Sequence, residues 1–259
     1  ELREYEKCTK WYDTLKGLDM WSHQMEEDEI AASFELNSTE VAMSKYELYT
    51  NTHKDKKLSP QIVVSAAKYY RTSGNMEQAL AQFDLSTDMH DPSILSERAK
   101  IAEKLEMWTE AEKLWLELRE ISHSEELSIR IIRALYEQKL YEKALNELKM
   151  IKTPAREEST NILAGEIFFA NARWKEADKC WTAASVAEEF TADHWLRLAR
   201  TRRKNNRVNA AIEAFKKASN ATDERTRIQE KALLSLASGE WKSAIEDLNE
   251  FIARKDLSP

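Results

Sequence analysis

The chain has 259 residues, of which 42% are hydrophobic and 33% are charged, and its 46 acidic and 39 basic side chains give a net charge of −7. This acidic balance argues against a general nucleic-acid binder, which would carry a basic surface. With only four Gly and four Pro, and no apolar run of about 18 residues that could span a membrane, the composition predicts an all-α protein.

Helical segments follow one another along the whole sequence. Residues 1–18 are predicted as a lone second helix, or half repeat, and residues 20–50 as a complete helix–turn–helix unit. The polar, lysine-rich segment 51–58 is interpreted as a hinge or an insertion. Further units are predicted at 59–90, 91–122, 124–155, 157–190, 191–222 and 223–256. Because the sequence begins inside a unit, we interpret the chain as a fragment of a larger protein.

Capping and turn residues support these boundaries. Ser59-Pro60 and Asp91-Pro92 each place a capping side chain before a proline in the first helical turn. Gly74-Asn75, Asn205-Asn206 and Gly239 predict the turns between the two helices of their units.

A small residue recurs about every 33 residues. These residues are Cys8, Ala42, Ala79, Ala111, Ala144, Ala177, Ala211 and Ala244, and their successive separations are 34, 37, 32, 33, 33, 34 and 33. Four positions after each one comes a large residue: Tyr12, Tyr46, Phe83, Trp115, Leu148, Trp181, Phe215 and Leu248. Residues four positions apart share one helix face, so each small residue is expected to let a second helix approach. The pattern predicts a repeat protein whose units pack against their neighbours.

The period, the helix–turn–helix unit and the small residue opening the second helix resemble the tetratricopeptide repeat (TPR). The small residue that this family places in the first helix matches Ala67, Ala99, Gly165, Ala199 and Ala232. The resemblance covers about residues 1–254 and implies an all-α, right-handed superhelical α-solenoid of about seven and a half repeats. Pentatricopeptide and half-a-tetratricopeptide repeats remain alternatives.

No catalytic or cofactor-binding motif occurs in the sequence. We therefore expect no enzymatic activity and no cofactor. The five histidines, His23, His53, His90, His123 and His194, share no i, i+4 spacing that would gather a metal ion, so no metal site is expected. Cys8 and Cys180 lie in distant units, which argues against a disulfide and favours a cytoplasmic (or nuclear) location.

In TPR proteins the first helices line a concave groove, and the resemblance assigns an excess of bases to that groove here. The candidate partner-binding residues are Lys68, Arg71, Lys100, Lys104, Arg133, Tyr136, Phe169, Arg200, Arg203 and Lys204. Guanidinium groups bind carboxylates and phosphates well, so an acidic ligand is expected. Ordinary solvated helix faces would also contain many Lys and Arg residues. The asparagines of the family's carboxylate clamp are absent, so binding of chaperone tails is not carried over.

Three functional hypotheses remain. The first is a non-catalytic protein–protein interaction scaffold that binds a peptide or partner helix in the concave groove. The second is an accessory or dimerisation arm of a larger enzyme, such as a modular glycosyltransferase or an envelope-assembly protein. The partner would then be another protein, the rest of the parent chain or a second copy. The third, an RNA-binding helical repeat, conflicts with the acidic balance and the lack of a repeated polar pair.

Overall fold

The computed structural model describes residues 7, 10–12, 14, 15, 22–36, 39–151, 158–218 and 223–253. Within these residues the chain is all-α, with fourteen helices, α2 to α15, and no β-strand. The predicted fold class is therefore confirmed. Most of the half repeat at 1–18, including Cys8, lies outside the described residues.

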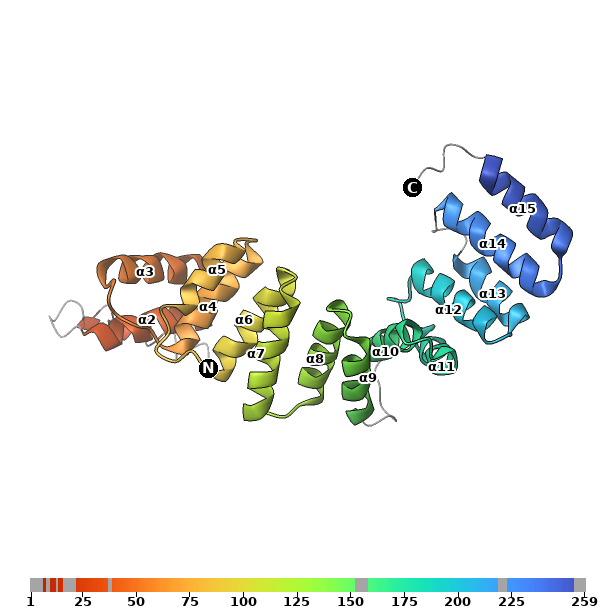
Figure 1. Cartoon of the computed structure of the whole chain (residues 1–259). Coiled ribbons are helices and arrows are strands. Elements are labelled where there is room, and N and C mark those ends of the chain that lie inside the picture. The colour runs from red at the N-terminus through yellow and green to blue at the C-terminus, as the bar shows by residue number, and fades with distance from the viewer. Residues whose placement is uncertain are drawn as a thin grey trace. The chain divides into compact units, whose positions relative to one another are not determined.

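The helices follow one another as seven helix–turn–helix pairs (Figure 1). The pairs are α2 (His23–Glu35) with α3 (Thr39–Thr52), α4 (Pro60–Thr72) with α5 (Met76–Phe83), α6 (Pro92–Lys104) with α7 (Trp108–Ile121), α8 (Glu125–Glu137) with α9 (Tyr141–Met150), α10 (Glu158–Ala170) with α11 (Trp174–Ala184), α12 (Ala192–Lys204) with α13 (Val208–Ala218), and α14 (Glu224–Ser238) with α15 (Trp241–Ala253).

The chain divides into two compact units, Glu1–Ala134 and Leu135–Pro259. In the N-terminal unit, each of α2, α4 and α6 packs on the helix that follows it, and α4 also contacts both α2 and α6. In the C-terminal unit, α10, α12 and α14 pack on their following helices, and α12 contacts α14. Each unit is thus a stack of helical hairpins whose first helices are neighbours.

The recurring small residues lie at the contacts between helices. Ala42, Ala79, Ala111, Ala144, Ala177, Ala211 and Ala244 all have 0% of their surface exposed. Of the large residues four positions later, Tyr46, Phe83, Trp115, Leu148 and Trp181 are at most 2% exposed. Leu248, in the last helix that the structure describes, is 38% exposed. The recurring residues therefore form the buried face of the second helices, as the repeat pattern predicted.

Six turns share one backbone conformation. The residue with positive φ is Gly74, Glu106, Lys139, Ala172, Asn206 or Gly239, with φ between 54° and 83°. In each turn the next residue donates its N–H to the carbonyl five residues back, at 2.8 or 2.9 Å. This bond is the signature of a Schellman motif, in which one left-handed residue ends a helix. The turns predicted at Gly74-Asn75, Asn205-Asn206 and Gly239 are confirmed.

The segment 51–58 begins inside α3, and its last residue, Leu58, is held by backbone hydrogen bonds. The Leu58 N–H donates to the Leu85 carbonyl at 2.8 Å, and the Thr87 N–H donates to the Leu58 carbonyl at 2.9 Å. The Leu58 side chain is 1% exposed and belongs to the core of the N-terminal unit. These contacts fix the end of the segment to the residues that follow α5.

Gly165 on α10 allows the Trp181 ring of α11 to approach the backbone closely. A Cβ atom at this position would lie 2.2 Å from Nε1 and 2.3 Å from Cδ1 of Trp181, and Trp181 is itself 0% exposed. We expect Gly165→Ala to lower the free energy of unfolding by about 1–3 kcal/mol, because neither the ring nor the helix can move freely. Urea denaturation of the full chain measures the change.

A double-mutant cycle tests the cause. The colliding atoms belong to the five-membered ring of the indole, so Gly165→Ala should cost clearly less in a Trp181→Phe background. Equal costs in the two backgrounds would show that crowding against Trp181 is not the reason for glycine here.

Candidate functional site

The ten predicted groove residues all lie on first helices. They are Lys68 and Arg71 on α4, Lys100 and Lys104 on α6, Arg133 and Tyr136 on α8, Phe169 on α10, and Arg200, Arg203 and Lys204 on α12. Lys68 to Arg133 belong to the N-terminal unit and Tyr136 to Lys204 to the C-terminal unit. The structure therefore describes two sets of candidate residues.

In the N-terminal unit, Arg71 is bound by a buried carboxylate of the next repeat. Its Nε atom donates to Oε1 of Glu97 on α6 at 2.5 Å, and Glu97 is 1% exposed. Lys100 lies 4.0 Å from the other oxygen of the same carboxylate. An ionised carboxylate is stable away from water only when it is paired, so Arg71 is needed for packing of α4 on α6.

The same connection occurs one repeat later with the charges exchanged. Arg130 on α8 donates to Glu103 on α6 at 2.8 Å. The other oxygen of Glu103 accepts from the Trp115 indole N–H on α7 at 2.8 Å. Charge pairs thus connect α4 to α6 and α6 to α8.

The C-terminal unit repeats this arrangement between α12 and α14. Arg200 donates to Glu230 at 2.5 Å, Arg203 lies 3.6 Å from its second oxygen, and Glu230 is 4% exposed. On the other side of α12, Arg197 donates to Glu166 of α10 at 3.4 Å. Of the predicted ligand-binding bases, Arg71, Arg200 and Arg203 therefore hold neighbouring repeats together.

The two predicted aromatic residues have different environments. Tyr136 is partly buried, its ring centroid lies 5.6 Å from that of Tyr141 with the rings tilted by 51°, and its hydroxyl interacts with Arg197. Burial and the nearby charge of Glu166 raise the pKa of Tyr136, while Arg197 acts in the opposite direction. Phe169 contacts the rings of Trp174 and Trp181 at 5.3 and 5.4 Å. Phe169 thus packs against the core of its unit.

Comparisons with known proteins address the fold. No protein-family model and no curated protein match the sequence. Among solved structures, PilW, a widely conserved type IV pilus biogenesis factor, matches with a TM-score of 0.57 at 17% identity, over 77% of this chain and 94% of PilW. YrrB, a TPR protein with an unusual peptide-binding site, matches with a TM-score of 0.55 at 15% identity, over 77% and 97%. A TPR protein from Parabacteroides merdae gives 0.55 at 12% identity, over 98% and 96%.

The chain has a TPR-like helical-repeat fold. At these identities the likeness concerns the fold alone. Among the described helices of this TPR-like chain, none is long and apolar enough to cross a membrane.

Four predicted bases are not used in stacking the TPR-like repeats. Lys68, Lys104, Arg133 and Lys204 are exposed and make no ion pair with any residue that the structure describes. Lys68, Lys104 and Arg133 occupy three consecutive first helices of the N-terminal unit, α4, α6 and α8. We call these three residues the basic face.

One cluster was missed by reasoning from sequence. His23 and His53 meet beside Glu26 although they are 30 positions apart, far more than the three or four positions that align side chains on one helix. A search for helical spacing cannot detect ligands that come from two helices of one TPR-like hairpin.

The pairing of Arg71 with Glu97 can be tested by removing one partner. We expect Arg71→Ala to lower the free energy of unfolding by about 2–3 kcal/mol, because it leaves the Glu97 charge buried without its main donor. Lys68→Ala, on the same helix but exposed, should change it by less than about 0.5 kcal/mol. Chemical denaturation of the three proteins provides the comparison.

The double variant Arg71→Met/Glu97→Met separates pairing from packing. Replacing both partners with apolar side chains removes the buried charge, so the double variant should be more stable than Arg71→Ala. If the double variant were no more stable than Arg71→Ala, an unpaired Glu97 charge would not explain the instability of Arg71→Ala.

Proposed function

We propose that this chain is a non-catalytic scaffold that binds an acidic peptide segment of another protein along the first helices of its N-terminal unit. The supporting observation is the basic face: Lys68, Lys104 and Arg133 are exposed and make no ion pair with a described residue. In a chain with a net charge of −7, this local excess of positive charge favours an acidic ligand over a basic one.

The chemistry of the three side chains sets the mode of binding. Lys68 and Lys104 present mobile ammonium groups, whereas the Arg133 guanidinium can hold one carboxylate through two parallel hydrogen bonds. Each exposed pair contributes about 0.2–1 kcal/mol. Binding by this face alone should therefore be weak, rapidly reversible and sensitive to salt.

One protein of similar fold supports the peptide-binding part of this proposal. YrrB is described as a TPR protein with an unusual peptide-binding site. We carry peptide binding over to this chain only as part of the proposal. A cytoplasmic or nuclear location also remains a proposal.

A second candidate function, as a dimerisation or accessory arm, is favoured by the last described helix. On α15, Trp241, Ile245, Leu248 and Ile252 are exposed by 63%, 57%, 38% and 75%. The residues equivalent to Leu248 in four earlier repeats, Phe83, Trp115, Leu148 and Trp181, are at most 2% exposed. The apolar face of α15 thus corresponds to a surface that is buried in earlier repeats but exposed here, and we propose a second copy of this chain as its partner.

Charge reversal tests the basic face. We expect the variant Lys68→Glu/Lys104→Glu/Arg133→Glu to lose at least tenfold in affinity for a fluorescent polyglutamate peptide, because three attractive contacts become repulsive. The matched control is Lys113→Glu/Lys143→Glu/Lys175→Glu, which makes the same charge change at exposed positions of second helices. Fluorescence anisotropy at low salt measures the affinity of both variants for the peptide.

Equal losses in the two variants would indicate a general effect of net charge and would contradict the basic-face proposal. Arg200 and Arg203 are unsuitable for this experiment. Reversing either charge would place it against the buried Glu230 carboxylate and would therefore change stability as well as binding.

The α15 face makes a separate prediction about oligomeric state. Sedimentation equilibrium of the full chain should show a concentration-dependent dimer, and Ile245→Asp/Ile252→Asp should shift it to monomer because charges would be buried in the interface. The control Val186→Asp changes an exposed apolar residue outside α15. A wild-type chain that stays monomeric at high concentration would eliminate the dimerisation role without affecting the basic-face proposal.

A further inference from the structure

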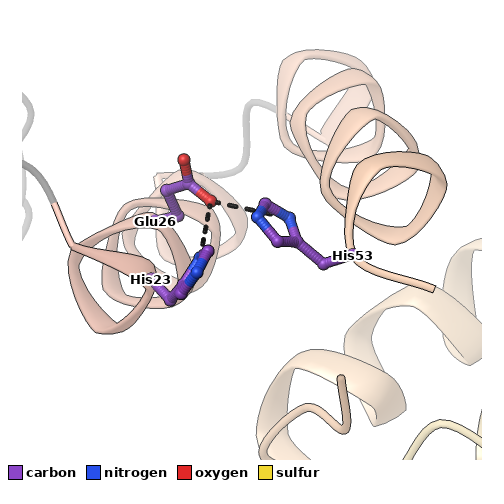
Figure 2. A group of neighbouring side chains, drawn as sticks. All are labelled: His23, Glu26 and His53. Carbon is purple, nitrogen blue, oxygen red and sulfur yellow. Dashed lines mark ion pairs between the residues drawn. The ribbon is translucent and has the colours of Figure 1, made fainter. Parts of the chain in front are cut away.

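Three possible metal ligands meet at one end of the α2/α3 hairpin (Figure 2). His23 is the first residue of α2, Glu26 lies one turn later, and His53 directly follows α3. The Nδ1 atoms of His23 and His53 each lie 3.8 Å from the same Glu26 oxygen. One ligand atom from each residue lies within 4.8 Å of the other two. The imidazole rings meet edge to face, with centroids 4.4 Å apart.

Local structure explains why these residues converge. Ser22 caps α2 by accepting a hydrogen bond from the Met25 N–H at 3.4 Å. Residues three apart lie on one face of a helix, which brings His23 and Glu26 together. At the end of α3, the His53 N–H donates to the Tyr49 carbonyl at 2.9 Å, and the two rings lie 4.6 Å apart. Packing of α2 on α3 then places His53 beside the start of α2.

The surroundings favour a cation at this point. The Tyr49 hydroxyl donates to Glu27 at 3.1 Å. Lys45 of α3, which lines the adjoining pocket, donates to Glu29 of α2 at 2.7 Å. A pocket of about 280 Å³ lined by Glu26, Tyr49 and His53, among others, opens beside the cluster, so water has access to it.

We propose that His23, Glu26 and His53 bind one Zn²⁺ ion. Two imidazoles and a carboxylate are a common ligand set for zinc, with protein ligand atoms about 2.0–2.2 Å from the metal. Ligand atoms around a tetrahedral ion then lie about 3.3–3.5 Å apart. Here each histidine Nδ1 lies 3.8 Å from the Glu26 oxygen, and ligand atoms of the three residues lie within 4.8 Å of one another. Small rotations close this difference, and the His23 side chain, which is 56% exposed, has room for them.

The proposed ion would connect the first residues of α2 to the residue that follows α3. With three protein ligands, the fourth coordination position is left to water from the adjoining pocket. Because the ligands come from the start of α2 and the end of α3, bound zinc should hold these helices together and stabilise the folded chain by mass action. The site lies outside the basic face and does not depend on the proposed peptide binding.

Zinc binding by the full chain is measured by competition with a chromophoric chelator. We expect one Zn²⁺ per chain and a rise in melting temperature when zinc is added. His23→Ala and His53→Ala should each weaken binding at least tenfold and abolish the rise in melting temperature. Glu26→Gln, which keeps the shape of the side chain, should also weaken binding. Co²⁺ in place of zinc should give visible absorption bands that the variants lose.

The controls are His90→Ala and His123→Ala, which change exposed histidines outside the cluster and should leave zinc affinity unchanged. If His53→Ala fails to fold by circular dichroism, His23→Ala, at the more exposed position, gives the decisive comparison. Unchanged binding in His23→Ala and His53→Ala, or no stoichiometric binding by the wild type, overturns the proposal. The cluster would then be only a pair of histidines beside a carboxylate.

Discussion

The structure depends on close contact between helices at fully buried small residues. At seven positions, one in each described second helix, an alanine has none of its surface exposed. A larger side chain there would push the neighbouring helix away, and the contacts of the residue four positions later would be lost. Gly165 extends the same constraint to a first helix, where the Trp181 ring occupies the space of a Cβ atom. Since the repeats within each unit stack on one another, the constraint must be met in every copy there.

A second constraint determines which repeats can be neighbours. All five buried carboxylates among the described residues have a basic partner, and three of them pair with a neighbouring repeat: Glu97 with Arg71, Asp178 with Arg202 and Arg207, and Glu230 with Arg200. The other two, Glu29 with Lys45 and Asp247 with Lys231, pair inside one repeat. Such pairs add little net stability over apolar packing, but a wrong neighbour would leave a buried charge unpaired. Between α4, α6 and α8 the sign of the pair alternates, so a repeat taken from one place would not fit the other.

Sequence patterns could predict the parts of the fold that depend on spacing along one helix. The alanine column is such a pattern. The glycines at 74 and 239 also made their turns predictable. Glu106, Lys139 and Ala172 adopt the same positive φ, but side chains of these types do not favour it, so their turns could not be predicted. The charge pairs and the histidine cluster join different helices, so helical periodicity could not reveal them. A weaker signal was present: Arg71 with Glu97, Glu103 with Arg130, and Arg203 with Glu230 are opposite charges 26 or 27 positions apart.

These two constraints identify the surface that is free for function. In the C-terminal unit, stacking occupies three bases of α12, since Arg200 and Arg203 lie against Glu230 of α14 and Arg197 lies against Glu166 of α10, and it leaves Lys204 exposed. In the N-terminal unit, stacking uses Arg71 and Arg130 and leaves Lys68, Lys104 and Arg133 exposed. The two units therefore offer different charges to a ligand, although their first helices are similarly rich in bases. Composition alone overestimates a binding surface in a repeat protein, because part of each charged face stabilises the contact with the next repeat.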